Sequence, residues 1–354
     1  MQTDFLIIGQ GLAGSLLAWE LIRRNCEVIV VDTGKANASL VAAGIINPIT
    51  GIRLVKTTDV DILLPAAHNC YNQLSSIIGQ PFYFEKPMYR IVKDEAERVR
   101  CTKRQTQAEY RHYLGDFFQP DQQIAGFSTP FGYIEQLQTG HLMTVPLLSQ
   151  LKQFFIEREG YRQTYFDYQA PQMDCAVHWQ GLTTKQVIFC EGYSAYHNPW
   201  FSWLPFQPAK GEILTLEHEI GLPNAILNYG HWLLPLSTDK IRVGATFDRA
   251  QIDTQCSEHG KQSLLDSLNA YSPPLAKANM TAHQAGIRPC TLDKNPYIGR
   301  HPHNERISIF NGFGAKGSLQ IPWYSQRFAD YLLNNIPLPV SCDIQRYQAD
   351  YFPG

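Results

Sequence analysis

Gly9-Gln10-Gly11-Leu12-Ala13-Gly14 is the stretch of sequence that decides the fold. It follows an apolar run at residues 5–8 and opens a helix-like stretch at residues 15–22. A second apolar run, at residues 28–31, ends at Asp32. A GxGxxG string is weak evidence alone, but between a strand and a helix it is typical of a dinucleotide-binding β-α-β unit.

The three glycines of this motif each meet a different steric demand. Gly9 permits the tight turn after the first strand, and Gly14 lets the helix pack closely on that strand. Gly11 has no Cβ, so a pyrophosphate can approach the backbone. The N–H groups of Leu12 and Ala13 would face the phosphates at the helix start, where the helix dipole favours negative charge. The alternative, a glycine-rich turn without a ligand, is disfavoured by this context.

An acidic residue ends the second strand, at the sequence distance from the glycine motif where a carboxylate that binds the ribose is expected. Asp32 lies about 18 residues after Gly14, where a carboxylate meets the adenosine ribose hydroxyls. Its charge would repel a 2′-phosphate, so the pattern disfavours NADP. Thr33 follows directly and is predicted to belong to the same binding site.

The composition bounds the size and the partners of the protein. The chain has 354 residues, 44% of them hydrophobic, which is enough for two domains or one large α/β unit. Its 30 Lys and Arg residues nearly balance 32 Asp and Glu residues, which argues against a nucleic-acid partner. The densest basic cluster is interpreted as a solvated helix face and consists of Arg98, Arg100, Lys103 and Arg104.

The eight cysteines and the apolar runs indicate the cellular compartment of the protein. No two cysteines form a CxxC pair, and their spacing matches no zinc motif. Cys26 and Cys190 adjoin apolar strands and are expected to stay reduced, as in a reducing compartment. The first predicted strand begins close to Met1, so we expect no signal peptide, and no apolar run approaches the roughly 20 residues of a membrane span. We therefore expect a cytoplasmic protein with no membrane partner.

Segments that suit a nucleotide-binding fold recur along the chain. One is the β-α-β unit at residues 4–32, and another is a buried strand at 186–190 followed by Gly192. A third is a strand at 307–310, after which a long helix runs to about residue 334. The remaining predicted elements are a loop at 38–56, helices at 62–79, 94–112 and 143–159, a strand at 82–93, and antiparallel strands at 211–218, 228–236 and 240–247.

This order predicts an α/β fold, mixed with α+β features, in which a nucleotide-binding domain is interrupted by segments of an antiparallel substrate domain. The two layers would leave a cleft between them, where small ligands usually bind. The predicted nucleotide-binding domain comprises residues 1–80, 135–210 and 280–354, and the predicted substrate domain comprises residues 81–134 and 211–279.

A second glycine cluster lies near the end of the chain, between the predicted strand at 307–310 and the helix after it. Glycines there expose backbone N–H groups, and the helix start adds a partial positive charge. Such donors, together with Lys316, would stabilise the negative charge that a reduced flavin carries at its N1–C2 edge. An ordinary strand–helix turn is the alternative interpretation. The residues predicted to contact the cofactor here are Gly312, Gly314, Ala315, Lys316, Gly317 and Ser318.

Four segments together resemble the D-amino-acid oxidase-like family of FAD-dependent oxidoreductases, and within it the glycine oxidases. They are spread over nearly the whole chain, although residues 60–140 are only loosely similar. The segment Gly286–Gly299 is quite specific to the family, whereas Gly9–Gly14 alone would not be. The four are Gly9–Gly14 with Asp32, Ser39–Pro48, Gly286–Gly299, and Gly312–Ser318 with its helix.

The resemblance implies a Rossmann-like FAD-binding domain of the glutathione-reductase type, interleaved with an antiparallel-sheet substrate domain. It implies FAD rather than NAD, bound in an extended form and noncovalently, since Cys290 does not fall where some relatives attach the flavin. It also implies that a small amine or amino acid is oxidised at its C–N bond by hydride transfer from the α-carbon to flavin N5. The imine then hydrolyses, and oxygen or another electron acceptor reoxidises the flavin.

Matching positions carry the family's substrate and flavin contacts. Arg288 matches the arginine that grips the substrate carboxylate, a task that suits a guanidinium fork. Trp232 stands where the family usually has a tyrosine that covers the substrate, and Tyr229 is a candidate to supply a hydroxyl from nearby. Gly192 matches the strand-end glycine near the phosphates, and Lys210 a basic residue before the substrate-domain sheet. The family loop beside the flavin supplies Ala43, Gly44, Ile45 and Ile46.

Three other functions stay open on the sequence. A flavin domain acting on the carboxymethylaminomethyl group of tRNA would use similar residues, because that substrate also has a secondary amine and a carboxylate, but the balanced charge argues against it. A flavin-binding protein without catalysis is disfavoured by Arg288 and both glycine clusters. An NAD-dependent dehydrogenase rests on the first motif alone. A homo-oligomer is compatible with the sequence, which does not decide the oligomeric state.

Overall fold

The first β-α-β unit forms at the fingerprint. In the computed structural model of the chain, which describes residues 1–173 and 175–352, β1 (Gln2–Ile8) leads into α1 (Leu12–Arg23) and β2 (Val28–Asp32). β1 and β2 pair in parallel. Both strands are largely apolar and buried, as expected of a parallel sheet that is covered on both faces.

β1 belongs to a mixed eight-stranded sheet with a parallel centre. β14 (Leu182–Phe189) pairs in parallel with β1 on one side and with β21 (Asn304–Asn311) on the other. The N-terminal, middle and C-terminal segments predicted to form the nucleotide-binding fold thus lie side by side. The remaining strands of this sheet are β11 (Tyr161–Gln163) beside β2, β12 (Gln172–Met173) and β13 (Val177–Trp179) beyond β14, and β20 (Tyr297–His301) beside β21.

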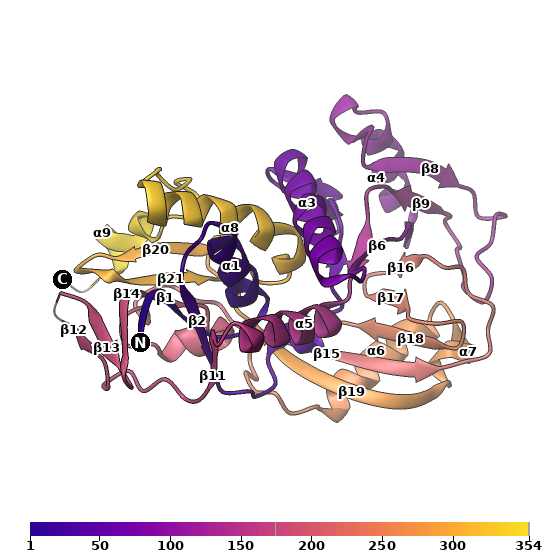
Figure 1. The fold of residues 1–354 in the computed structure, drawn as a ribbon. Coiled ribbons are helices and arrows are strands. Elements are labelled where there is room, and N and C mark those ends of the chain that lie inside the picture. The colour runs from indigo at the N-terminus through magenta and orange to yellow at the C-terminus, as the bar shows by residue number, and fades with distance from the viewer. Residues whose placement is uncertain (174, 353–354) are drawn as a thin grey trace.

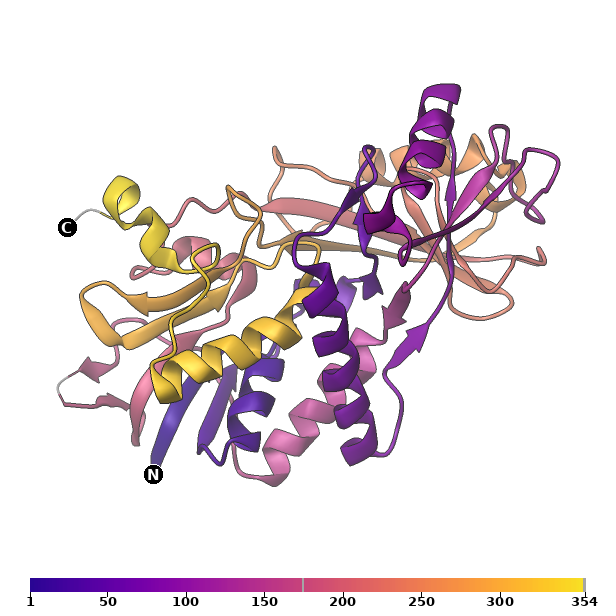
Figure 2. The same ribbon diagram turned by 90° about the horizontal axis from the view of Figure 1, so that it is seen from above.

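Four helices form one core with this sheet. α1 and α8 (Gly317–Asn334) pack against each other, so a helix near the start of the chain and one near its end lie side by side, in indigo and yellow in Figures 1 and 2. α3 (Val60–Ile78) packs on α8, and α5 (Thr144–Glu157) packs on α1. The helices predicted at these four positions are confirmed. Each has an apolar stripe, which it buries against its neighbours.

A second core, rich in aromatic side chains, also packs against the parallel sheet. Phe189 of β14 makes an edge-to-face contact with Phe166, with ring centroids 5.6 Å apart. The chain end adds to this core through a 3₁₀ turn, Ile344–Tyr347, which leads into α9 (Gln348–Tyr351). Apolar layers therefore bury the central strands, and the ligand-facing positions lie at the ends of the strands.

The other eight-stranded sheet is antiparallel except where β16 pairs with β7. Its order is β19–β15–β18–β17–β16–β7–β9–β8, and α6 packs on β15. In Figure 1 it occupies the side of the molecule away from both chain ends. Its strands are β7 (Met88–Ile91), β8 (Leu114–Phe118), β9 (Tyr133–Gln136), β15 (Ala209–Glu217), β16 (Ile226–Asn228), β17 (Trp232–Pro235), β18 (Lys240–Gly244) and β19 (Asn279–Arg288), with α6 (Glu258–Asn269) and α7 (Pro273–Ala276) beside them.

Two predicted strands are broken by turns. Residues 228–236 form a hairpin of β16 and β17, because Gly230 takes a φ of +107° and reverses the chain. Residues 82–93 divide into β6 (Tyr83–Glu85) and β7, with Pro87 between them, which has no N–H for a strand ladder. The helix predicted at 94–112 is shorter and consists of α4 (Glu95–Gln105) and a 3₁₀ turn, Ala108–Tyr110.

The prediction of a plain loop at 38–56 is wrong. The side chain of Asn37 accepts hydrogen bonds from the N–H groups of Ser39 and Leu40 and so starts a short helix. β3 then joins β10 and β6 in a three-stranded sheet. These short elements are α2 (Ala38–Val41), β3 (Ile45–Ile46), β4 (Ile49–Thr50), β5 (Val55–Lys56) and β10 (Gly140–Leu142).

The strand pairing refines where two domains would be divided. The predicted boundary between residues 134 and 135 cuts β9, and the one before residue 280 cuts β19 at its start. Both strands pair within the antiparallel sheet, so we propose domain boundaries near residues 137 and 289.

Across the described ranges, no helix has the length and apolar character needed to cross a membrane.

Candidate active site

A cavity of about 580 Å³ runs from the fingerprint to the antiparallel sheet. We divide its walls into three parts, each built from different elements. The nucleotide end contains Gly9, Gly11, Leu12, Ala13, Asp32, Thr33, Glu191 and Gly192. The middle contains Ala43, Gly44, Ile45, Gly314, Ala315, Gly317 and Ser318. The sheet end contains Gly211, Ile213, Trp232, Ala245, Thr254 and Arg288.

At the nucleotide end, two glycines allow the backbone to pack closely. Gly9 has a φ of +107°, and a Cβ there would lie 2.5 Å from the carbonyl oxygen of Cys190. A Cβ on Gly14 would lie 1.9 Å from the carbonyl oxygen of Gly9, although Gly14 is not on the cavity wall. Only glycine fits at either position, so the turn and the helix start are held by backbone contacts.

Two long helices, α1 and α8, begin at the wall of this cavity. The N-cap residue of α1, Gly11, offers no side-chain cap, and Leu12 N donates to Ser39 Oγ at 3.0 Å. The N-cap residue of α8, Lys316, also makes no side-chain capping bond. Uncapped helix starts carry a partial positive charge that favours anions. The residues present therefore fit the pyrophosphate of a dinucleotide.

Asp32 is held by two backbone amides at the edge of the cavity. Its Oδ2 accepts from Gln10 N at 2.8 Å, and its Oδ1 accepts from Gly34 N at 2.6 Å. Each carboxylate oxygen has a second lone pair, so the group can still accept from ribose hydroxyls. Thr33 lies beside it on the wall.

A half-buried acid that the sequence motifs did not indicate lies beside Gly192, whose φ is +57°. Glu191 accepts from the hydroxyl of Tyr168 at 2.7 Å and from Asn198 Nδ2 at 2.8 Å. Burial raises the pKa of Glu191 from its ordinary 4.5 to about 7, although both hydrogen bonds oppose the shift. The available signal was a charged residue directly after the apolar strand at 186–190.

The middle of the cavity brings together the loop after α2 and the start of α8. Gly44 has a φ of +69°, and a Cβ there would lie 1.9 Å from the carbonyl oxygen of Leu142, so this loop also depends on glycine. Ile46, predicted with it, is fully buried behind the wall. Two chain segments about 270 residues apart thus share one surface.

Two predicted members of the second glycine cluster do not line the cavity. Gly312 packs against Thr291 and Tyr297, where a Cβ would lie 2.6 Å from the Thr291 Cγ2. Lys316 Nζ donates to Thr57 Oγ1 at 3.2 Å, away from the wall. Burial lowers the pKa of Lys316. We therefore assign the donors near a flavin to backbone amides and not to this ammonium.

The sheet end is centred on Arg288, the last residue of β19. Its Nη1 donates to Lys210 O at 3.2 Å and its Nη2 to Thr246 O at 3.1 Å, and the ring of Phe247 lies 5.5 Å from the guanidinium carbon. A Cβ on Gly211 would lie 2.3 Å from Nη2, so this glycine makes room for the arginine. Burial lowers the pKa of Arg288, yet a guanidinium stays charged.

No carboxylate pairs with Arg288 among the residues that the structure describes. Lys210, by contrast, is buried with its Nζ 2.7 Å from Asp253 Oδ1, so it serves as a structural charge. A half-buried guanidinium that has no carboxylate partner among the described residues and has N–H groups to spare is the feature that best distinguishes this end of the cavity.

Of the two predicted aromatic site residues, only Trp232 lines the cavity. Tyr229 packs on the other side of the sheet, against Phe127 and Tyr271 and in one core with α6 and α7. The proposal that its hydroxyl reaches a substrate is therefore wrong. Cys290 is half-buried and does not line the cavity, and burial raises the pKa of its thiol.

Comparisons with known proteins agree with this geometry. A family model described as FAD dependent oxidoreductase matches residues 4–331. The chain is 25% identical over 364 residues to glycine oxidase of Pseudomonas putida, which covers 96% of each protein. It is 23% identical over 376 residues to the tRNA 5-methylaminomethyl-2-thiouridine biosynthesis bifunctional protein MnmC of Hahella chejuensis, covering 95% of this chain and 58% of that protein. The fold of glycine oxidase from Bacillus cereus matches with a TM-score of 0.80 at 21% identity, covering 95% of this chain and 96% of that one.

Proposed function

The chain belongs to the family of FAD-dependent oxidoreductases, and on this premise we propose that it oxidises the C–N bond of a small amine or amino acid. FAD supplies, when bound, the acceptor for the hydride that leaves the substrate α-carbon. The neutral amine that loses this hydride becomes an iminium, and water then hydrolyses it to a carbonyl compound and protonated ammonia or, from a secondary amine, a protonated amine. Oxygen or another acceptor completes the cycle.

The observation that carries the proposal is the unpaired guanidinium of Arg288 at the sheet end. A substrate carboxylate would supply its missing anion through two parallel hydrogen bonds, and this pairing would fix the α-carbon relative to the middle of the cavity. Trp232 and Ile213 add apolar walls that exclude water from the reacting carbon. No wall residue of the sheet end, as described, is acidic, so the substrate amine would react as the neutral base.

The test is a visible spectrum of the purified protein, followed by mixing without oxygen with glycine, sarcosine, proline and D-amino acids in turn. We expect the absorption band of an oxidised flavin, and its loss with at least one of these substrates. A protein that neither contains nor takes up FAD would contradict the cofactor assignment. A flavoprotein that keeps its band with every amine would contradict the proposed reaction.

A second candidate is oxidation of a carboxymethylaminomethyl group on tRNA, which the likeness of 95% of this chain to 58% of MnmC favours weakly. Arg288 and the apolar wall would suit that group too, since it carries a carboxylate next to a secondary amine. The formal net charge of −2 opposes binding of a polyanion. Loss of the flavin band with modified tRNA, but with none of the free amino acids, would favour this function.

We also propose a reducing compartment, the cytoplasm, as the place of action. All eight cysteines, each within the described ranges, are free thiols. Measuring the reaction with oxygen and with an artificial dye under the same conditions would identify the class of electron acceptor. Sedimentation of the flavin-loaded protein would decide whether copies of the chain assemble.

A further inference from the structure

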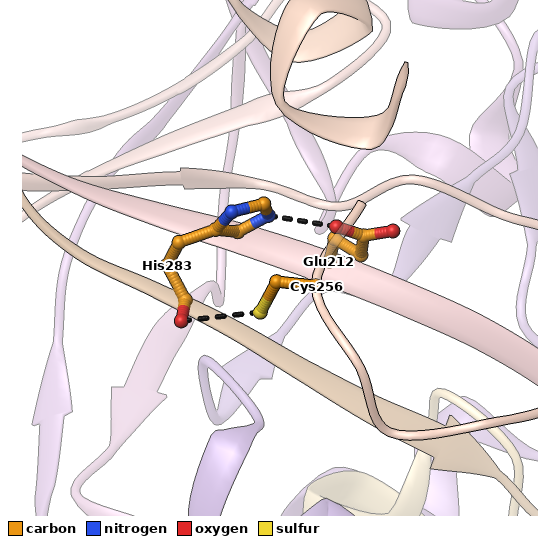
Figure 3. A group of neighbouring side chains, drawn as sticks. All are labelled: Glu212, Cys256 and His283. Carbon is orange, nitrogen blue, oxygen red and sulfur yellow. Dashed lines mark hydrogen bonds and ion pairs between the residues drawn. The ribbon is translucent and has the colours of Figure 1, made fainter. Parts of the chain in front are cut away.

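Three potential metal ligands converge outside the cavity, on the outer strands of the antiparallel sheet. Glu212 comes from β15, His283 from the neighbouring β19, and Cys256 from the end of the loop at residues 245–256, which connects β18 to α6 (Figure 3). One ligand atom of each residue lies within 4.8 Å of those of the other two. None of the three lines the cavity.

We propose that Glu212, Cys256 and His283 bind a thiophilic divalent cation, with Zn²⁺ as the best match. Zinc favours sulfur, imidazole nitrogen and carboxylate oxygen in a tetrahedral arrangement. A thiolate and a carboxylate would neutralise its two charges. Cys256 is exposed, so water can occupy the fourth position and a cation can enter from solvent. The sequence could not show this site, because its ligands come from three separate elements.

The present contacts need only a small adjustment to hold an ion. His283 Nε2 lies 2.7 Å from Glu212 Oε2, so one proton joins the two atoms in a hydrogen bond. A cation with metal–ligand bonds of about 2.0–2.1 Å would replace that proton and move the two atoms several tenths of an ångström apart. The Cys256 thiol, which now donates to the carbonyl oxygen of His283 at 3.2 Å, would give up its proton and turn to the ion.

The surroundings of Glu212 would orient it as a ligand. Ser257 Oγ donates to its Oε1 at 2.7 Å, and Ser257 N donates to its Oε2 at 2.9 Å. Partners of this kind hold metal-binding carboxylates in one orientation. Lys210 Nζ lies 3.7 Å from Oε1, but its closer partner is Asp253 at 2.7 Å, so its charge is already paired.

Protons would compete with the cation at Cys256. Each bound cation therefore displaces a thiol proton, and the affinity rises with pH. Binding would also tie the end of the loop at residues 245–256 to the sheet, and Ala245 and Thr254 of this loop line the sheet end of the cavity.

The competing explanation is that these residues only anchor the start of α6 by hydrogen bonds. A Cβ on Gly260 in its first turn would lie 2.5 Å from the Glu212 carboxylate, which shows how closely the two pack. A purely structural anchor binds no ion, so metal binding separates the two explanations without reference to enzyme activity.

The experiment uses the full chain with its cofactor, freed of metal by a chelator and titrated with Zn²⁺ against a competing indicator. We expect one ion per chain, and affinity more than about 100-fold weaker in Cys256→Ser and in His283→Gln. Gln can still donate to Glu212, which keeps the anchor of α6. Cys175→Ser removes a different exposed thiol and should leave the affinity unchanged.

A second readout reports the ligands directly. Co²⁺ in place of Zn²⁺ should add a thiolate-to-cobalt charge-transfer band to the difference spectrum, and Cys256→Ser should abolish that band. The proposal is overturned if the parent protein binds no stoichiometric Zn²⁺, or if Cys175→Ser weakens binding as much as Cys256→Ser does. Thermal unfolding of the metal-free variants checks that each one is folded.

Discussion

The two ends of the cavity are built in opposite ways. The nucleotide end is mostly backbone, shaped by consecutive residues from Gly9 to Gly14 with Asp32 beside them. The sheet end is made of side chains, such as Trp232 and Arg288, which come from strands far apart in sequence. The nucleotide end depends on positions that have no side chain, whereas the sheet end depends on strand pairing that brings distant side chains together. Substitutions should therefore act on folding and FAD retention at one end and on substrate recognition at the other.

The largest effect is expected for Gly14→Val. Its Cβ would lie 1.9 Å from the carbonyl oxygen of Gly9, and backbone atoms cannot yield as a side-chain tip can. We expect a loss of about 3 kcal/mol or more in the free energy of unfolding, together with loss of FAD. Urea unfolding and the flavin content of the purified protein measure both.

The matched control is Gly221→Ala, at a glycine that has no heavy atom within 4 Å of an added Cβ. It should change the free energy of unfolding by less than about 0.5 kcal/mol. If Gly14→Val kept both its flavin and its stability, close backbone packing would not be what shapes the nucleotide end.

This contrast also explains which features the sequence could predict. The β-α-β unit and the parallel strands β14 and β21 depend on local patterns and are found where those patterns place them. The placement of Lys316 failed, because a strand–helix motif fixes the backbone but not the direction of a long side chain, which here reaches Thr57. Glu191 was missed because no motif requires it.

The failure at Tyr229 has a different physical origin. Side chains alternate between the faces of a strand, so residues 229 and 232 would not share a face even in a continuous strand. The turn at Gly230 makes the segment a hairpin, with Trp232 at the cavity and Tyr229 in the core beside α6. The period-2 rule could have excluded Tyr229, but only the paired strands show which face meets the cavity.

The second largest effect is expected for Arg288→Met, which keeps much of the side-chain length but removes the charge. We expect kcat/KM for an amino-acid substrate to fall about 100- to 1,000-fold, mostly through KM, while the flavin spectrum stays unchanged. Steady-state kinetics and the visible spectrum of the same sample test this. Arg300→Met, at an arginine that stacks on Tyr331 away from the cavity, should alter kcat/KM less than about twofold. Equal losses in both variants would show that Arg288 has no specific role.

A smaller effect is expected for Asp32→Asn, which tests the main side chain of the backbone-built end. The amide oxygen can still accept from one N–H group, but the charge and the second acceptor oxygen are lost. We expect FAD to bind about tenfold more weakly, which corresponds to about 1.4 kcal/mol. Flavin fluorescence during titration of the flavin-free protein gives the dissociation constant. Asp4→Asn, near the other end of β1, provides the comparison and should bind FAD normally.

The smallest effect is expected for Glu191→Gln and appears only as a dependence on pH. Burial raises the pKa of Glu191 to about 7 in the folded protein, against an ordinary value of 4.5, so the folded state favours the neutral carboxyl. Its contribution to stability is complete below about pH 4.5 and is lost as the pH rises through about 7. Gln is neutral throughout and can still accept a hydrogen bond. The stability of the parent relative to the variant should therefore fall by about 1 kcal/mol between pH 5 and pH 8, a modest amount because the group faces the water of the cavity.

Urea unfolding of both flavin-free proteins at the two pH values measures this difference, with the exposed substitution Glu219→Gln as control. A difference that stayed constant, or that grew in favour of the parent at pH 8, would mean that Glu191 is ionised and stabilised by Tyr168 and Asn198. The nucleotide end would then carry a second fixed negative charge besides Asp32, which a bound pyrophosphate would have to overcome.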